Sequence, residues 1–378
     1  MEIIALIVFI TIGIHIEVYL YKKKILPHIV YDCYFSKDEV VEGESLEIIE
    51  TVMNPSPLFI PCLKSEIVTS KYLEFAGNVS TVNDQTCSLA SLFAIKSKQK
   101  IKRTWKIRCL QRGVFKLEDT MIVGTDLFGI YQYSDMLKQN SKLVVLPRPI
   151  DVSGYMEYMS EAQGDQVVKR FILEDPFEIA GVREYNMSDS MNKIHWGITA
   201  KQGQIMVRNN EATVKRSLTL IVNNQLYSDQ LKEPMHDERL EYAIRIAAGE
   251  LDKTISTSTP VRLLANGGVN DSNESLVTRQ MWGQAHVYEL FVLLASLKPT
   301  YTEHFDKFLK RYEHSIETTE VIIVTCYIDE PILEFVRAKQ SMGIHAKIYL
   351  LSYEVDSKKY KDIEIYYLLD YLKEVGER

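Results

Sequence analysis

Hydrophobic and polar positions divide the chain into an apolar run, a region of short strand-like segments and a region of alternating strands and helices. The apolar run extends from Ile3 to Tyr21, is interrupted by His15 and Glu17, and is followed by Lys22 to Lys24. Nineteen residues in a helix rise about 28 Å, close to the roughly 30 Å of a bilayer's hydrocarbon core. The run therefore predicts a membrane-spanning helix that contacts lipid through residues 3–21.

The charges on either side of this helix predict its orientation. No Lys or Arg precedes the apolar run and three lysines follow it, so the positive-inside rule places everything after Lys22 in the cytoplasm. A cleaved signal peptide is the alternative, but no positive residue precedes the run and no small-x-small cleavage site follows it. We expect an uncleaved single-pass anchor in the cell membrane, with Tyr19 and Tyr21 as interfacial belt residues.

The region from Val30 to about Pro147 is rich in β-forming residues. Its short runs are separated by turn-forming pairs such as Glu-Gly and Arg-Gly, and no window has a convincing helical period. This pattern predicts an antiparallel β-sandwich. The expected strand regions are Ser45 to Val52, Phe59 to Thr69, Lys100 to Leu110, Gly113 to Val123 and Lys142 to Leu146.

From Ser217 onward, apolar strands alternate with helices. Such alternation predicts a mainly parallel, doubly wound α/β sheet. The expected strands are Leu218 to Val222, Val261 to Ala265, Val321 to Cys326 and Ala346 to Leu351. The expected helices are Asp237 to Leu251, His286 to Leu297, Pro331 to Met342 and a last one within Tyr360 to Val375. The predicted parts are an anchor (1–24), a β-sandwich (25–148), a connector (149–212) and an α/β domain (213–378).

The net charge and the cysteines indicate which class of partner to exclude and in which compartment the protein lies. The net charge of −7 and the lack of a long basic run outside Lys22 to Lys24 argue against a nucleic-acid partner. The cysteines are odd in number, widely spaced and without a Cys-x-x-Cys pair, which is typical of buried thiols in a reducing compartment. They are Cys33, Cys62, Cys87, Cys109 and Cys326.

The stretch from Arg183 to Arg208 fits neither amphipathic period. It is too polar for a core strand and contains too much Ser, Asn and Gly for a helix. One interpretation is an ordered connector whose side chains bond its own backbone; the other is a binding segment. The candidate interaction residues are Arg183, Tyr185, Asp189, His195, Trp196, Lys201 and Arg208.

The same stretch resembles the signature of family fifty-eight of the bacterial and archaeal domains of unknown function. The positions that match in register are Arg183, Tyr185, Asp189, Ile194, Trp196 and Ala200. The departures are Ser188, Asn192, Thr199 and Lys201, which indicate a divergent member. Further segments similar to that family are Arg112 to Phe115, Thr125 to Ile130 and Leu143 to Pro147.

This resemblance implies a fold and a function. The α/β domain would be a von Willebrand factor type A-like module. Members of the family are often encoded beside MoxR-class AAA ATPases, and the pair is thought to act in the assembly or maturation of other complexes. The chain would then be a non-enzymatic, membrane-anchored interaction protein. Its docking surface would comprise the signature stretch and the loops at the carboxyl ends of the strands, where open α/β sheets bind ligands.

The resemblance also locates a candidate metal site. A metal-binding module of this type has Asp-x-Ser-x-Ser after its first strand, and here Asn223, Gln225 and Tyr227 stand at those positions. None of the three is an anionic ligand, which Mg²⁺ needs in exchange for its water. We expect a degenerate site that binds no metal, and no other cofactor; a site shifted to Ser228 and Asp229 is the alternative.

His195 is the best catalytic candidate, and a hydrolase that uses His195 and Asp189 at the domain junction is the alternative function. No Gly-x-Ser-x-Gly elbow or other nucleophile motif surrounds these residues, which favours a structural histidine and a protein without enzymatic activity. We further expect Trp196 and Tyr185 to anchor the stretch on the sheet domain and Arg183 to pair with Asp189. Truncating a buried Trp196 to Ala would then cost about 3 kcal/mol.

Overall fold

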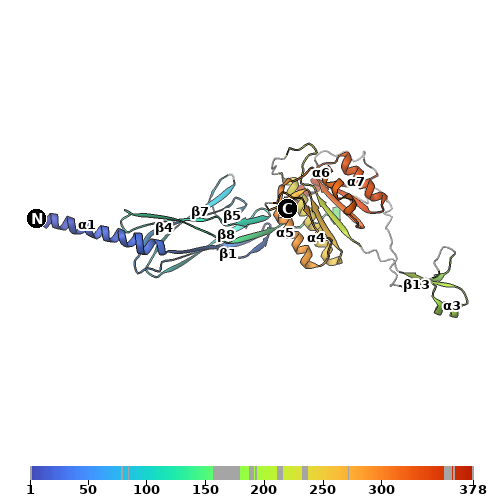
Figure 1. The fold of residues 1–378 in the computed structure, drawn as a ribbon, viewed down its shortest axis with the longest axis horizontal. Helices are drawn as coiled ribbons and strands as arrows, with labels where there is room; N and C mark the ends of the chain where they lie inside the picture. The colour runs from blue at the N-terminus through green and yellow to red at the C-terminus, as the bar shows by residue number, and fades with distance from the viewer. Residues whose placement is uncertain are drawn as a thin grey trace. The chain divides into compact units, whose positions relative to one another are not determined.

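The computed structural model describes residues 2–77, 80–83, 85–155, 179–186, 191, 194–210, 216–231, 237–270, 272–352, 360 and 362–376. The chain divides into two compact units, whose elements are drawn in Figure 1. The first unit comprises Met1–Arg148 and Phe291–Leu297, and the second comprises Pro149–Leu290 and Lys298–Arg378.

The first unit begins with a long helix that ends inside a protein core. Helix α1 (Glu2–Leu20) continues through a π-helical turn, η1 (Tyr21–Ile25), and a 3-10 turn, η2 (Leu26–His28). Residues Ile3–His28 are long and apolar enough to cross a membrane, a property that an anchor and a signal sequence share. Three side chains of the two turns, Tyr21, Ile25 and Leu26, are 0–2% exposed and belong to the β-sandwich core.

This packing corrects one expectation about the helix. Tyr19 is 54% exposed, as a belt residue would be, whereas Tyr21 is completely buried. The π-helical turn begins at Tyr21, and the Tyr21 hydroxyl donates a hydrogen bond to the carbonyl of Phe59. Tyr21 is therefore a core residue of the first unit, not a belt residue.

Twelve strands form the expected β-sandwich. They are β1 (Val30–Phe35), β2 (Glu39–Val41), β3 (Ser45–Met53), β4 (Ile60–Ser70), β5 (Leu73–Phe75), β6 (Thr81–Val82), β7 (Thr86–Ile95), β8 (Lys100–Cys109), β9 (Gly113–Lys116), β10 (Thr120–Thr125), β11 (Gln132–Leu137) and β12 (Lys142–Leu146). Two antiparallel sheets have the orders β1-β3-β8-β5 and β11-β10-β4-β7-β6. A third sheet has the order β2-β12-β9, in which β12 pairs parallel with β2.

One expected strand is two strands. The region Gly113 to Val123 contains β9 and β10, which belong to different sheets. Between them the Glu118 N–H donates to the carbonyl of Val68 on β4. The chain crosses from one sheet to another here, so the apolar residues on both sides of Glu118 could not show the break.

The second unit is built on a mainly parallel six-stranded sheet. Its strands are β15 (Leu218–Val222), β16 (Val261–Ala265), β18 (Leu276–Val277), β20 (Glu320–Thr325), β21 (His345–Leu350) and β22 (Glu364–Tyr367). The order is β18-β16-β15-β20-β21-β22, and only the edge strand β18 is antiparallel to its neighbour. The strands β17 (Gly267–Val269) and β19 (Leu297–Tyr301) form a separate two-stranded sheet.

Helices cover both faces of this sheet, as the alternating pattern predicts. The helices of this unit are α4 (Glu238–Thr257), α6 (Phe305–Tyr312), α7 (Glu330–Ser341) and α8 (Leu369–Gly376), while α5 (Gln284–Ser296) is divided between the two units. The apolar residues of α6 and α7 form one core with the strands, while α4 packs against β15 and β20 (Figure 1). The expected helix within Tyr360 to Val375 is only partly correct, because Glu364–Tyr367 pairs with β21 as a strand and the helix begins at Leu369.

Candidate functional site

The stretch from Arg183 to Arg208 contains regular structure that its polar composition did not predict. Strand β13 (Ile179–Glu184) pairs antiparallel with β14 (Met206–Asn210), and α3 (Trp196–Gln202) lies between them in the chain. A hairpin is held by backbone hydrogen bonds, so it can form without a long apolar face. The described part of this stretch is therefore ordered, and the side chains of His195 and Thr199 accept hydrogen bonds from its own backbone.

His195 has a structural role in this hairpin. Its Nδ1 accepts a hydrogen bond from the Ile198 N–H at 3.3 Å, so His195 is the N-cap of α3. Its own N–H donates to the Met206 carbonyl at 2.8 Å. A ring nitrogen that accepts carries no proton, so the neutral ring holds its proton on Nε2. His195 thus uses its side chain and its backbone to join α3 to β14.

Among the other candidates, the structure describes the side chains of Tyr185, Trp196 and Lys201. Trp196 is 70% exposed and α3 buries none of its side chains, so the expectation that Trp196 anchors the stretch is wrong. The small core of the hairpin contains Ile194, Met206 and Val207 instead. Tyr185 is half-buried and Lys201 is exposed. Arg183 and Arg208 lie in the paired strands, whereas Asp189, Ser188 and Asn192 lie outside the described residues.

A second group of polar residues lies at the carboxyl edge of the parallel sheet. The strand order changes direction there between β15 and β20, which is where open α/β sheets bind ligands. Asn223, Asn224 and Gln225 follow β15, Asn266 follows β16, and Thr325 ends β20. All five residues, which we call the amide cluster, are 0–1% exposed.

Hydrogen bonds link the members of the amide cluster to one another and to neighbouring backbone groups. Asn223 Nδ2 donates to Thr325 Oγ1 at 3.0 Å, and Asn223 Oδ1 accepts from the Gln225 N–H at 3.0 Å. Asn266 Oδ1 accepts from the Asn224 N–H at 2.7 Å. Gln225 Oε1 accepts from the backbone N–H of Phe305, the first residue of α6, at 2.6 Å. Neutral groups therefore fill the edge of the sheet, and among the described residues the buried Asn224 Oδ1 has no hydrogen-bond partner.

The positions of the candidate metal site lie in and beside this cluster. Asn223 and Gln225 are buried in it, while Tyr227 is 47% exposed and accepts a hydrogen bond from Arg239 Nη2 at 2.9 Å. Ser228 and Asp229, the alternative site, are exposed. Within the described ranges, no three or more His, Cys, Asp or Glu side chains are grouped so that they could hold a metal ion.

The sequence indicated only part of this cluster. Asn223 and Gln225 were candidate positions, but the bonds of Asn266 to residues about 40 positions earlier were not expected. The available signal was the run of three amide side chains after one buried strand together with Asn266 after the next. Carboxyl ends of neighbouring parallel strands meet at one edge, so these amides could have been grouped.

An ordered loop borders the amide cluster. The segment from Tyr227 to Leu231, which we call the rim loop, exposes 47% of Tyr227 and 77% of Leu231. Gln230 fixes the loop: its Oε1 accepts from the Leu226 N–H at 2.6 Å, and its carbonyl accepts from the Tyr301 hydroxyl at 2.5 Å. Two large side chains are thus presented to solvent on a held backbone.

The amino edge of the same sheet is charged. Glu320 Oε1 lies 2.9 Å from Lys347 Nζ and 3.9 Å from His345 Nδ1, while His345 Nε2 lies 2.7 Å from Glu364 Oε2. Glu320 and Glu364 raise the pKa of His345 to about 9. Burial alone would raise the pKa of Glu320, but hydrogen bonding with His345 and the charge of Lys347 lower it below its ordinary value.

The first unit has its own buried polar centre, which the sequence did not reveal. Glu50 on β3 is 0% exposed and accepts hydrogen bonds from both sheets. Tyr31 Oη donates at 3.0 Å and Trp105 Nε1 at 3.2 Å from one sheet. From the other sheet Ser91 Oγ donates at 2.9 Å, and Ser65 donates as well. This carboxylate joins the two layers of the β-sandwich.

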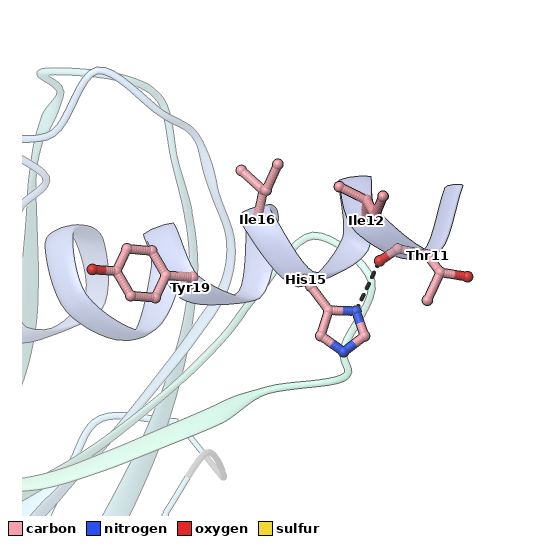
Figure 2. Close-up of a pocket in the computed structure, with 5 residues that line it drawn as sticks. All are labelled: Thr11, Ile12, His15, Ile16 and Tyr19. Atoms are coloured by element: carbon pink, nitrogen blue, oxygen red, sulfur yellow. Dashed lines mark hydrogen bonds between the residues drawn. The ribbon is translucent and has the colours of Figure 1, made fainter. Parts of the chain in front are cut away.

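A shallow groove on α1 is less informative. Figure 2 shows its lining, which comes from one helix: Thr11, Ile12, His15, Ile16 and Tyr19. His15 Nδ1 lies 2.8 Å from the Thr11 carbonyl and donates to it, so this ring nitrogen is already bonded. The groove brings together no group of reactive side chains.

Comparisons with known proteins do not identify the chain. No family model and no curated protein matches it. A CARDB domain from Pyrococcus furiosus matches with 11% identity over 29% of this chain and 86% of that one, with a TM-score of 0.20. A non-cellulosomal cohesin from Archaeoglobus fulgidus matches with 10% identity over 34% of this chain and 96% of that one, with a TM-score of 0.21. The cohesin–dockerin complex from Clostridium thermocellum matches with 13% identity, 31% and 99% coverage, and a TM-score of 0.22. Similarities of this size carry no argument about function.

Proposed function

We propose that this chain is a membrane-anchored, non-enzymatic interaction protein that binds a MoxR-class AAA ATPase at the carboxyl edge of its α/β sheet. The observation that carries this proposal is the buried, neutral amide cluster beside the exposed rim loop. At the edge where ligands of such sheets bind, neutral side chains bond one another, while Tyr227 and Leu231 are exposed. Tyr is enriched among residues that dominate protein interfaces.

The class of partner comes from the resemblance to family fifty-eight of the domains of unknown function. In that interpretation the α/β unit is a von Willebrand factor type A-like module with a degenerate metal site. Two observations support it: the doubly wound sheet with one antiparallel edge strand, and Asn223 and Gln225 within the amide cluster. The role of His195 as a helix cap also supports a protein without enzymatic activity.

Anchoring by an uncleaved helix with a cytoplasmic body is part of the proposal. The lysines Lys22 to Lys24 follow the apolar run, as the positive-inside rule requires for a cytoplasmic body. Tyr21, Ile25 and Leu26 fill the core of the first unit. Cleavage after any of these residues would remove buried side chains, which favours an intact helix over a removed signal sequence.

The test is capture of the ATPase from detergent-solubilised membranes, with the bound proteins identified by mass spectrometry. The rim variant combines Tyr227→Asp with Leu231→Asp, and the control is Met342→Asp. Met342 is 59% exposed at the end of α7, at the amino edge of the sheet. We expect the wild type and the control to capture a MoxR-class ATPase and the rim variant to lose it. Equal capture by the rim variant, or no ATPase with the wild type, would contradict the proposal.

A hydrolase using His195 and Asp189 is the alternative, and a separate outcome would support it. Turnover by the purified chain that His195→Ala abolishes, with an unchanged melting curve, would favour the enzyme. Because His195 caps α3, the unchanged melting curve is the necessary control.

A further inference from the structure

Two loops of the β-sandwich expose large apolar side chains beside α1. One loop joins β3 to β4 and the other joins β10 to β11. Single exposed apolar residues are common on protein surfaces, but a group on neighbouring loops marks an interaction site. The exposed members are Leu58 (39%), Phe59 (41%), Leu127 (49%), Phe128 (64%) and Ile130 (59%).

Specific contacts hold both loops against the end of α1. The Leu127 N–H donates to Glu17 Oε1 at 2.9 Å, and Tyr21 donates to the carbonyl of Phe59. Lys22 Nζ lies 5.7 Å from the centre of the Tyr131 ring, at the end of the β10–β11 loop. Glu17 is the one acidic residue in the apolar run from Ile3 to Tyr21. Its contact with Leu127 gives this carboxylate a defined hydrogen-bond partner.

These contacts fix the position of the two loops along the axis of α1. Glu17 precedes Lys22 by five residues, which corresponds to about 7–8 Å of helix rise. The β10–β11 loop therefore reaches beside the apolar run instead of stopping at the lysines. The buried side chains of Tyr21 and Leu26 fix α1 to the β-sandwich, so this position follows from the packing.

A third loop adds positive charge at the same end. The β7–β8 loop exposes Lys96 and Lys98, and Lys100 is exposed at the start of β8. Asn54 Nδ2 donates to the Lys96 carbonyl at 3.1 Å, and the Lys98 N–H donates to the Ser56 carbonyl at 3.2 Å. The lysine-rich loop is thus packed on the β3–β4 loop, next to its apolar residues.

We infer that these three loops form a lipid-contacting surface, whose apolar residues enter the boundary between headgroups and acyl chains of the membrane that α1 spans. The occupant is a bilayer and not a second protein, because the surface is continuous with α1 and combines apolar side chains with lysines. This combination suits the interfacial region of a membrane with anionic lipids. The inference rests on the proposed anchoring by α1.

The consequence is a defined orientation. A single helix allows the domain attached to it to take many tilts, whereas contacts on one side of that helix favour one tilt. The β-sandwich would then present one fixed side to the membrane, with its remaining surface available to partners.

Nitroxide labels on the full chain in phosphatidylcholine–phosphatidylglycerol vesicles test this inference. Cys62 is replaced by Ala because it is half-buried, whereas the other four free cysteines are buried and should not react. Labels are placed at Phe128→Cys, at Val82→Cys and at Phe9→Cys. Val82 is the control site, because it is 61% exposed, similar to Phe128. It pairs with Cys87 on β7, and Cys87 is about 26 Å along that strand from Ile95, where the β7–β8 loop begins.

Collision of each label with oxygen and with a water-soluble nickel chelate reports its environment. We expect the labels at positions 128 and 9 to collide little with the nickel chelate and often with oxygen, as labels in a bilayer do. The label at position 82 should collide with the nickel chelate as a label in water does. A label at 128 that is as accessible to nickel as the one at 82, while position 9 is protected, would overturn the lipid-contacting surface alone. Nickel access at position 9 would overturn the anchor, and this inference with it.

Discussion

The buried polar centres of the two units differ in charge and in hydrogen bonding. In the first, Glu50 is one ionisable acceptor among four donors that come from two sheets. In the second, the amide cluster is neutral, and its members both donate and accept. A carboxylate can only accept when ionised, so it must collect donors from its surroundings, whereas amides can close a network among themselves. The first arrangement joins two layers, and the second closes one edge.

The largest expected effect is the loss of the Glu50 acceptor. Glu50→Ala should destabilise the β-sandwich by about 3 kcal/mol or more, because each buried donor left without an acceptor costs about 1–3 kcal/mol. Hydrogen exchange of peptides from β3 and β8, followed by mass spectrometry, would measure this for the first unit alone. Glu47→Ala on the same strand is the control, since Glu47 is only half-buried. Equal effects of both variants would show that Glu50 does not join the sheets.

In the amide cluster the converse substitution introduces a carboxylate instead of removing one. Asn223→Asp should cost about 2 kcal/mol or more at pH 7, because burial without a compensating cation penalises a carboxylate. Burial raises the pKa of such a carboxyl, so the difference from wild type should shrink as the pH falls toward 4. The melting temperature of the α/β unit at the two pH values checks this.

The expectation that the degenerate site binds no metal can be tested on the wild-type protein. Wild type should show no gain in melting temperature with millimolar Mg²⁺, because a ligand that binds only the folded state must raise its stability. A clear shift that Asp229→Asn removes would establish the alternative site at Ser228 and Asp229.

A smaller effect is expected at the charged amino edge, which contrasts with the neutral carboxyl edge. The folded-state pKa of His345 is raised to about 9 by Glu320 and Glu364, from an ordinary value of about 6.5. The resulting stability is complete below pH 6.5 and is lost as the pH rises through 9. Because 39% of the side chain is exposed, solvent screening limits the loss to about 1–2 kcal/mol. Unfolding at pH 6.5 and 9.5 measures it, and His345→Gln should remove most of the difference.

The smallest effect is expected in the β13–β14 hairpin. Trp196 is 70% exposed, so Trp196→Ala should change hydrogen exchange in this hairpin by less than about 0.5 kcal/mol. Val207 is 0% exposed, and Val207→Ala should cost about 2 kcal/mol. A Trp196 effect as large as that of Val207 would restore the anchoring role that the sequence predicted.

Strong local patterns made most of the fold predictable. The strands β15 and β16 have the expected limits because each is a short run in which a single polar residue, Thr219 or Arg262, interrupts apolar ones. The β-sandwich followed from alternation and turn residues. The missed features depend on tertiary pairing: the break at Glu118 occurs where the chain changes sheets, and β22 is a strand because it pairs with β21.

The buried polar centres were harder to predict. Glu50 lies in phase with Leu46, Ile48 and Val52, so the alternation along β3 marked it as inward-facing. Its donors Ser91 and Trp105 lie 41 and 55 residues away, beyond any local pattern. In the amide cluster, the positions after β15 were recognised, but Thr325 is 102 residues from Asn223. Local sequence can mark single members of such a centre as inward-facing, but it cannot assemble the centre.

The end of α1 has a mechanical consequence. A side chain at Gly124 would place its Cβ 2.8 Å from Leu26 Cδ2, so the β-sandwich closes around the helix without spare room. Tyr21 and Ile25 are buried beside it. The border between the exposed apolar helix and the β-sandwich core therefore lies inside one continuous helical segment, and a version shortened at its amino end should retain Tyr21. A rotation of that helix about its axis would turn the β-sandwich with it, because no flexible linker separates the two.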